Sequence, residues 1–464
     1  MTTRLAEVQD ADAPRNEVRL AELLGALSYA LDLTEGQPIG HCVRATWIGI
    51  ETGRELGLPP MQLWELYYTV MLKDLGCSSN AARICELYLS DDIGIKRGFK
   101  TMGDSLPKVL GFVLSHTGRR SPLADRLRAV LNIVQNGGAI VDDLIQTRCH
   151  RGAEIAASLR FPSTVSQGIY ALDEHWNGAG RPDRLVGSAI PVYARIALLA
   201  QVAEVFHAAA GPEAALAEIA RRTGTWFDPH IAAAFERAAA RPGFWETLAS
   251  PDVAATVMAM EPGRSLIRVD EDYLDDIACA FAKVVDSKSP FTSGHSERVA
   301  VYADMVAGEM GWDPERRRWL RRAALLHDIG KLGVSNAILD KNGKLDDEEW
   351  REMRGHAALS ESILARVPVF REMARIGGGH HERLDGKGYP RGLRGTEIEL
   401  ETRIVSVADV FDALTADRPY RAAMSIEAAL DIMRRDVGLA FDPDCLAALE
   451  RAVLCIEGDL RRAA

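Results

Sequence analysis

The sequence predicts an all-α protein built from two tandem copies of one helical domain. Aromatic residues make up only 6% of the 464 residues, and Ala and Leu are abundant, which favours helices over sheets. Residues 294–312 place apolar side chains at spacings of three and four, the periodicity of an amphipathic helix. Period-two alternation is hard to find over more than a few residues. Motifs that recur in both halves of the chain predict the duplication.

The recurring motifs follow the same order in the two halves. From the first half to the second, they pair Gly40-His41 with Gly294-His295, Leu72-Lys73-Asp74-Leu75-Gly76 with Leu326-His327-Asp328-Ile329-Gly330, Arg148-Cys149-His150 with Arg354-Gly355-His356, Asn177-Gly178-Ala179-Gly180-Arg181-Pro182 with Asp385-Gly386-Lys387-Gly388-Tyr389-Pro390, Arg195-Ile196 with Arg403-Ile404, and Phe227-Asp228-Pro229 with Phe441-Asp442-Pro443. One match can arise by chance, but a series in one order indicates an internal duplication. The first copy also carries a longer segment between Leu75 and Thr147, and it lacks the stretch that occupies 415–421 in the second.

Proline and glycine mark the boundary between the copies, which falls between about Arg241 and Asp270. We therefore predict a first domain at 15–245, a linker at 246–269 and a second domain at 270–464. Near the end of the second domain, Asp442-Pro443 predicts the start of a helix, with the aspartate as N-cap and the proline at the first helical position.

Composition excludes several classes of protein. The formal net charge of −11 argues against broad binding to DNA or RNA. The 7 cysteines are scattered without a Cys-x-x-Cys pair, which indicates free thiols in a reducing compartment. The first residues lack the apolar core of a signal peptide, and Arg195 and Glu204 interrupt the apolar run at 190–206, so we expect no membrane span. These features predict a cytoplasmic protein.

The segment 380–390 reads HHERLDGKGYP and is the most informative stretch of the chain. Histidine is uncommon and is the usual metal ligand near neutral pH, so the adjacent His380 and His381 suggest a metal site. The glycines that follow suit a tight turn, and Pro390 restricts the backbone where that turn ends. Packing explains this combination poorly, so we predict a metal site beside a shaped loop.

The second copy contains enough ligands for two metal ions. Imidazole and carboxylate groups together suit Fe, Mn or Zn, and Asp328 is placed to bridge two ions while its neighbour binds one of them. Two metals roughly 3.5–4 Å apart would activate a hydroxide and stabilise the leaving oxygen of a phosphate ester. The candidate ligands are His295, His327, Asp328, His356, His380, His381 and Asp409.

These motifs resemble the HD-GYP family of metal-dependent phosphodiesterases. The resemblance rests on His327-Asp328-Ile329-Gly330-Lys331, then His356, the HHERLDGKGYP string and Asp409, and it covers roughly Asp270 to Leu449. It implies an HD-superfamily helical bundle with the seven ligands at a binuclear centre. It also implies hydrolysis of cyclic di-GMP to pGpG, and on to GMP, and an N-terminal degenerate HD-like domain fused to a catalytic HD-GYP domain.

The resemblance also implies residue roles around the metals. Lys331 matches a phosphate-contacting lysine that would stabilise charge on the phosphoryl oxygens, and Asp328 would bridge the metals as the second catalytic residue. Tyr389 matches a residue near the nucleotide, and Arg418 and Arg421 match residues that hold phosphate or guanine, a task that suits the planar guanidinium. Some family members carry a glutamate where this chain has Phe291, so we predict two metals rather than three.

Several alternatives stay open at this point. Fe or Mn is expected first, with Zn, Ni, Co or Mg as other candidates. The substrate could instead be cyclic GMP-AMP or a linear dinucleotide such as pGpG. A signalling scaffold is a second class of function, in which the GYP loop binds a partner such as a diguanylate cyclase domain with little turnover. A homodimer is also considered.

The first copy lacks most of these ligands. Lys73 replaces His327, Leu172 and Asp173 replace the paired histidines, and Gln201 replaces Asp409, whereas His41, Asp74 and His150 are retained. A lysine would introduce a cation where a metal would sit. We therefore predict no complete metal site here and a role in packing against the catalytic copy, with dimerisation or ligand sensing as alternatives.

Overall fold

The computed structural model describes residues 19–101, 106–119, 121–263, 269–417 and 421–463. Within these ranges the regular elements are helices, and extended pairing is limited to isolated bridges, which confirms the all-α prediction. The first part of the chain forms α1 (Leu20–Thr34), α2 (His41–Glu55), α3 (Pro60–Met71), α4 (Ala81–Tyr88), α5 (Asp92–Thr101), α6 (Leu106–His116), α7 (Leu123–Ala157), α8 (Ser163–Tyr170), the 3-10 helix η1 (Gly187–Ala189), α9 (Val192–Ala210), α10 (Pro212–Arg222), α11 (Pro229–Ala239), α12 (Phe244–Ala249) and α13 (Val253–Ala259). The second part forms α14 (Glu271–Asp286), α15 (His295–Glu309), α16 (Pro314–Leu326), η2 (Ile329–Gly333), α17 (Asn336–Leu339), α18 (Asp347–Leu364), η3 (Pro368–Phe370), α19 (Met373–Gly379), η4 (Gly395–Glu397), α20 (Leu400–Thr415), α21 (Ile426–Arg434) and α22 (Pro443–Ala463).

The predicted helix starts agree with the structure. The amphipathic segment 294–312 contains α15, and α22 begins at Pro443. The Asp442 carboxylate accepts the N–H of Asp444 at 3.0 Å, and Asp228 caps α11 in the same way by accepting the N–H of His230 at 2.8 Å. Each cap satisfies a backbone donor that the first turn of a helix leaves unpaired.

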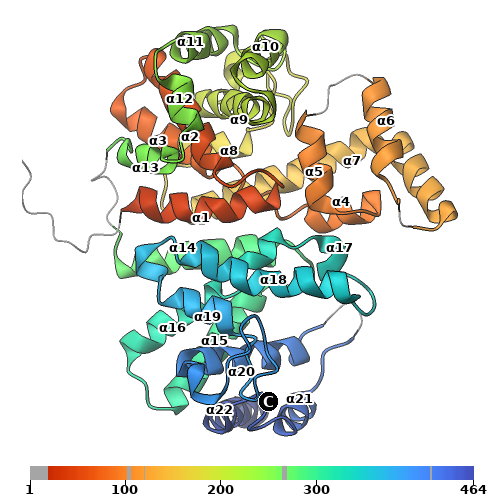
Figure 1. Ribbon diagram of the computed structural model, residues 1–464, viewed down its shortest axis with the longest axis vertical. Coiled ribbons are helices and arrows are strands. Elements are labelled where there is room, and N and C mark those ends of the chain that lie inside the picture. Colours follow the sequence, from red (N-terminus) through yellow and green to blue (C-terminus); the bar gives the residue numbers. More distant parts are fainter. Residues whose placement is uncertain (1–18, 102–105, 120, 264–268, 418–420, 464) are drawn as a thin grey trace, which may run out of the picture.

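The two copies lie against each other (Figure 1). Helix α1 runs along the boundary and contacts η2 and α18 of the second copy. A single cluster of buried apolar side chains extends through both copies. At the edge of this boundary, the Asp92 carboxylate accepts the N–H of Asn336 at 2.8 Å and the O–H of Ser335 at 3.2 Å. The start of α5 is therefore attached to the segment that follows η2.

The same polar contacts recur in both copies. The Arg44 guanidinium donates to Glu204 at 2.6 Å, and the Arg298 guanidinium donates to Asp412 at 2.6 Å. In each case the arginine lies on the helix that begins with a histidine of the HD-type motif. The recurrence of these contacts supports the predicted duplication.

One prediction about the register of the copies is wrong. A Cβ atom on Gly330 would collide with the carbonyl oxygen of His356, and a Cβ atom on Gly76 would collide with that of Arg148. Arg148 is therefore the counterpart of His356, and His150 is not. The side chain of His150 is instead exposed beside the ring of Tyr170. The insertion in the first copy shifts the register, so a short Arg-x-His match was misleading.

Part of the predicted linker belongs to the first copy. Val253 and Val257 of α13 are buried, and the Tyr67 hydroxyl donates to the carbonyl oxygen of Val257 at 3.1 Å. Helix α12 packs in a similar way, because the Trp47 indole donates to the carbonyl oxygen of Phe244 at 3.2 Å. The segment that connects the copies is therefore shorter than 246–269, and the remaining domain limits stay predictions.

The longer segment of the first copy forms α4, α5, α6 and the beginning of α7. Its apolar side chains build a small cluster that is separate from the main core. Figure 1 shows α6 and the start of α7 projecting to one side of the molecule. One helix elsewhere, α9, is long and apolar enough to cross a membrane, but 67% of its apolar window is buried inside the protein. It is the central helix of the first copy.

The close backbone approach at Gly76 can be tested by adding a methyl group. We expect Gly76→Ala to lower the free energy of unfolding by about 1–3 kcal/mol, because the backbone of α7 near Arg148 must move. The matched control is Gly111→Ala in α6, where a Cβ meets no atom within 4 Å, and it should be neutral or stabilising by up to about 1 kcal/mol. Urea unfolding measures both. Equal stability of the two variants would contradict this packing.

Candidate metal centre

Seven side chains converge inside the second copy, and they are the ligands that the sequence predicts. They are His295 at the first residue of α15, His327 and Asp328 between α16 and η2, His356 on α18, His380 and His381 after α19, and Asp409 on α20. Six of them form two groups whose donor atoms lie within 4.8 Å of one another. We call these the first ligand group (His295, His327 and Asp409) and the second ligand group (His356, His380 and His381).

The carboxylate of Asp328 lies between the two groups. Its Oδ2 atom is 3.5 Å from Nε2 of His295 and 3.2 Å from Nε2 of His327. Its Oδ1 atom is 3.4 Å from Nε2 of His356 and 3.6 Å from Nε2 of His380. Each group therefore faces a different oxygen of one carboxylate, which is the arrangement that a bridging ligand requires.

Backbone carbonyl groups orient three of the imidazoles. Nδ1 of His327, His356 and His380 donates to the carbonyl oxygen of the residue three positions earlier, at 2.6, 2.5 and 2.9 Å. A carbonyl oxygen can only accept, so the proton of each neutral ring is on Nδ1 and a lone pair is on Nε2. The three lone pairs point toward Asp328. Metal-binding histidines are commonly oriented in this way by their other ring nitrogen.

The donor atoms at this centre fit divalent metal ions. Nε2 of His295, His327, His356 and His380 is buried without a hydrogen-bond partner among the described residues, and so is Oδ1 of Asp328. Buried polar atoms nearly always have a hydrogen-bond partner. An imidazole lone pair that faces a carboxylate is repelled by its negative charge. Cations placed between these atoms would satisfy them. Nitrogen and carboxylate oxygen donors suit Fe, Mn or Zn.

Protonation in the metal-free centre follows from burial and from the carboxylates. Burial lowers the pKa of His356 to about 3 and the pKa of His381 well below its usual range, so both rings are neutral, as ligands must be. Burial would also lower the pKa of His295, but the neighbouring carboxylates of Asp328, Asp409 and Asp412 outweigh this and raise the pKa to about 10. A metal ion would displace that proton.

Asp412 supports His295 and was not predicted from the sequence. Its Oδ2 atom lies 2.7 Å from Nδ1 of His295, and Arg298 donates to its other oxygen at 2.6 Å. The carboxylate holds the ring so that Nε2 faces the first ligand group. A signal was present, because Glu204 occupies the matching position of the first copy, three residues after Gln201, as Asp412 follows Asp409.

Glu382 shapes the loop that follows the paired histidines. Its buried carboxylate accepts the N–H groups of Arg391, Gly392 and Leu393 at 2.7, 3.1 and 2.9 Å. The loop is thereby folded back on its own start. As a result, the ring of Tyr389 lies 4.7 Å from that of His381, at the edge of the second ligand group.

The residues predicted to contact the substrate differ in how close they lie to the centre. Lys331 donates to Oδ2 of Asp328 at 2.5 Å, so its ammonium group lies at the centre. Arg421 donates to the carbonyl oxygens of Ala413 and Leu414 at 2.6 and 2.7 Å and caps α20, so its role in substrate binding stays a prediction. Arg418 lies outside the described residues.

Two further observations concern the rim of the centre. The exposed guanidinium of Arg354 lies 5.4 Å from the centre of the Tyr389 ring, which makes it a cation at the rim that the sequence did not identify. Phe291 places no carboxylate near His295, and its N–H donates to Ser289 at 3.1 Å. The described residues thus provide ligand candidates on both sides of Asp328, and the number of metal ions stays a prediction.

The corresponding region of the first copy contains internal cations. Nζ of Lys73 lies 3.0 Å from Nε2 of His41 and forms an ion pair with Asp74. Burial would lower the pKa of Lys73, but the Asp74 carboxylate outweighs this and raises the pKa above its usual value. The ammonium therefore occupies the space between the counterparts of a ligand histidine and of the bridging aspartate.

A second ion pair replaces the second ligand group. Arg148, the counterpart of His356, pairs with Asp173, the counterpart of His381. The remaining position of that group is taken by Leu172, which is buried. The first copy thus balances its buried carboxylates with side-chain cations rather than with a set of imidazole ligands.

The support that Asp412 gives to His295 can be tested through metal affinity. We expect Asp412→Asn to weaken metal binding by about 10–100-fold, because the amide no longer fixes the tautomer and orientation of the ring. The matched control is Glu204→Gln in the first copy, which should leave metal affinity unchanged. Metal titration of folded protein measures both. Unchanged affinity in Asp412→Asn would show that this carboxylate does not support the centre.

Comparison with known proteins agrees with this geometry. The HD domain family model matches residues 128–231 and 280–445. The chain is 52% identical over 439 residues to the 3'3'-cGAMP-specific phosphodiesterase 3 of Vibrio cholerae, covering 95% of both proteins. It is 41% identical over 172 residues to the cyclic di-GMP phosphodiesterase response regulator RpfG of Xanthomonas campestris, covering 37% of this chain and 46% of that protein.

The same likeness extends to a solved structure. The crystal structure of the cyclic GMP-AMP-specific phosphodiesterase V-cGAP3 of V. cholerae matches with a TM-score of 0.65 and 47% sequence identity, and the match covers 94% of this chain and 98% of that one. The match therefore extends over both helical copies of this chain. The chain belongs to the HD-GYP family of cyclic-dinucleotide phosphodiesterases.

Proposed function

We propose that this protein is a metal-dependent phosphodiesterase that hydrolyses 3'3'-cyclic GMP-AMP. The observation that carries the proposal is the centre around Asp328, in which four imidazole nitrogens and one oxygen of the carboxylate are buried without hydrogen-bond partners among the described residues. The choice of substrate is supported by the relative named as specific for 3'3'-cGAMP, because that likeness covers 95% of the chain, including the first copy and its inserted helices.

Cyclic di-GMP, the substrate expected from the motifs, is the second candidate. The relative RpfG, whose name gives this substrate, matches 37% of this chain. The motifs of the second copy therefore support hydrolysis of a cyclic dinucleotide, whereas the likeness over the full length of the chain favours 3'3'-cGAMP as the substrate. The cytoplasmic location and a homodimer stay predictions.

The two ligand groups and Asp328 are the residues that would hold two divalent ions. Such ions would supply positive charge that polarises a phosphate oxygen and makes water more acidic. Fe and Mn remain the first candidates from the donor set. Binding would also release the proton that His295 holds in the metal-free centre.

Side chains at the rim would position the substrate. The Lys331 ammonium group lies next to Asp328 and would turn to a phosphoryl oxygen, where it stabilises the negative charge that develops during hydrolysis. The ring of Tyr389 offers a surface for stacking a base beside His381, and Arg354 offers a guanidinium at the same edge. A dinucleotide has both the phosphate and the bases that these groups can bind.

We further propose that the first copy binds no metal. Lys73 and Arg148 supply charge where the second copy would need cations, and each is paired with a carboxylate. The first copy would then serve as a structural partner, since α1 and the start of α5 contact the segments around η2.

The double variant His327→Ala/Asp328→Ala tests the reaction. We expect loss of bound metal and a fall in turnover of 3'3'-cGAMP by roughly 10³-fold or more. Removal of a single group that stabilises the transition state often lowers kcat by about 10²–10³-fold. The matched control, Lys73→Met/Asp74→Asn, changes the corresponding pair in the first copy and should retain turnover. Product analysis by chromatography measures both.

Substrate choice is measured with the wild-type protein in the same assay. We expect kcat/KM for 3'3'-cGAMP to exceed that for cyclic di-GMP by about tenfold or more, a difference of about 1.4 kcal/mol. An equal or higher value for cyclic di-GMP would contradict the proposed substrate. Bound metal without turnover of either dinucleotide would favour a signalling scaffold.

A further inference from the structure

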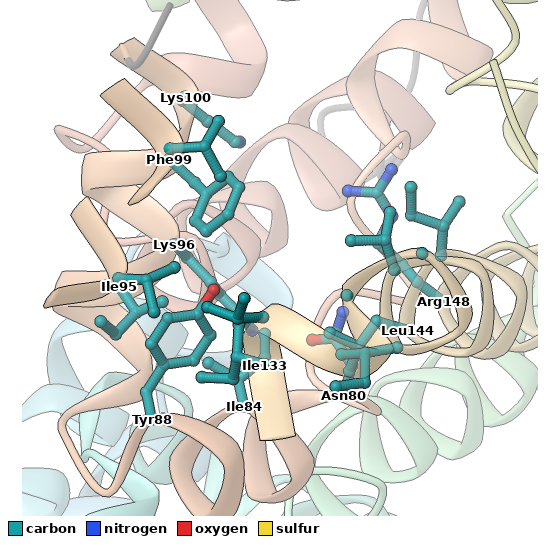
Figure 2. Close-up of a pocket in the computed structure, with 18 of the residues that line it drawn as sticks. Asn80, Ile84, Tyr88, Ile95, Lys96, Phe99, Lys100, Ile133, Leu144 and Arg148 are labelled. Atoms are coloured by element: carbon teal, nitrogen blue, oxygen red, sulfur yellow. The ribbon is translucent and has the colours of Figure 1, made fainter. Parts of the chain in front are cut away.

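A pocket of about 890 Å³ lies in the first copy, among the helices that the second copy lacks. It is lined mainly by α4, α5, α6 and α7, and none of the seven candidate ligands of the second copy lines it (Figure 2). Its volume falls in the range of about 300–1,000 Å³ that is typical of small-molecule sites. The metal centre does not explain this feature.

Most of the wall is apolar. Figure 2 shows Tyr88, Ile95 and Phe99 on one side and Leu144 on the other. Gly137 lies in the middle of α7 on the same helical face as the apolar lining, and a Cβ atom there would meet no atom within 4 Å. Glycine destabilises a helix interior, so its presence in a helix of 35 residues is unusual. Its missing side chain leaves room for the pocket.

One end of the pocket is charged. Lys96, Lys100 and Arg148 line it together with a single acid, Glu35. Lys100 lies 2.7 Å from Glu35, whereas Lys96 donates to the carbonyl oxygens of Thr34 and Cys77.

More cations than carboxylates line this end. Of the four charged side chains in the wall, Lys96, Lys100 and Arg148 are cations and Glu35 is the carboxylate. All four are buried or nearly so, and Lys96 and Lys100 share Glu35. An anion that entered this end would therefore meet positively charged side chains.

A polar side chain in the wall also lacks a partner. Asn80 is only 8% exposed, lines the pocket, and its Oδ1 atom has no hydrogen-bond partner among the described residues. A buried amide oxygen of this kind is rarely left unpaired. A ligand with an O–H or N–H group could satisfy it.

We propose that this pocket binds an amphipathic anion, a molecule with an alkyl or aromatic body and an acidic head group, and that occupancy is transmitted to the catalytic copy through α5. The body would lie against the apolar wall, and the head group would meet Lys100 and Arg148. Helix α5 carries Lys96 and Lys100, and its first residue, Asp92, is bonded to the segment after η2, which itself follows Asp328. The site goes beyond the proposed function and is independent of which dinucleotide is hydrolysed.

A second copy of this chain is the competing occupant. Apolar side chains on the projecting part of α7, among them Leu123, Leu127 and Leu131, are exposed and would suit contact between helices. These leucines do not line the pocket, so a helix packed on them would not meet Lys100, Arg148 or Asn80. The charge and the unpaired amide therefore favour the small anion.

The experiment is calorimetric titration of the full chain with decanoate, with decylammonium as a probe of the same tail and opposite charge. We expect decanoate to bind with one molecule per chain and decylammonium to bind at least tenfold more weakly. Gly137→Phe should abolish decanoate binding by filling the pocket, and Lys100→Met should weaken it at least tenfold. The matched control Gly111→Phe places the same ring on α6, outside the lining, and should bind decanoate as the wild type does.

Turnover and association state complete the test. Saturating decanoate should change kcat at least twofold in the wild type and in Gly111→Phe, but leave Gly137→Phe unaffected. Absence of decanoate binding, or equal binding by Gly137→Phe, would overturn the site. Binding without any change in kcat would overturn the transmission through α5. A dimer in sedimentation analysis that Leu131→Ser dissociates, together with no decanoate binding, would assign this face to a second copy.

Discussion

The arrangement of the second copy depends on the burial of lone pairs around one carboxylate. Three backbone carbonyl groups and Asp412 fix Nδ1 of four imidazoles, so the opposite nitrogens face Asp328 from two sides. No protein donor among the described residues satisfies these nitrogens. Helices α15, α18 and α20 each contribute ligand candidates to this space, and cations placed there would satisfy them.

The first copy meets the same constraint in another way. It retains the helix that begins with His41 and the Arg44–Glu204 pair that supports it, but Lys73 and Arg148 bring positive charge on side chains of the protein itself. The side chains of Lys73 and Arg148 already supply the positive charge that a metal ion would bring. Unlike a metal ion, they offer no open coordination position for a phosphate oxygen. Duplication has therefore preserved the helical frame, whereas the full set of His and Asp ligand candidates is present in the second copy, and the inserted helices give the first copy a pocket of its own.

Much of this could be predicted from residue patterns, and the failures have physical causes. The helices, the duplication and the seven ligands follow from periodicity and from motifs of His and Asp. The match of His150 with His356 failed because an insertion before it shifts the register, and only the close approach at Gly76 reveals that Arg148 is the counterpart. Helix α13 lay in the predicted linker, since short apolar segments give little periodic signal. Asp412 acts through a contact with His295, which is far away in sequence, so only comparison with Glu204 of the first copy could have pointed to it. Glu382 acts on the backbone of its own loop, which a pattern of side chains does not reveal.

Location of metal in crystals by anomalous diffraction tests the central claim most directly. We expect two metal peaks per chain, one on each side of the Asp328 carboxylate, and no peak between His41 and Asp74, where Lys73 lies. A single metal, metals that avoid Asp328, or a metal bound in the first copy would contradict it.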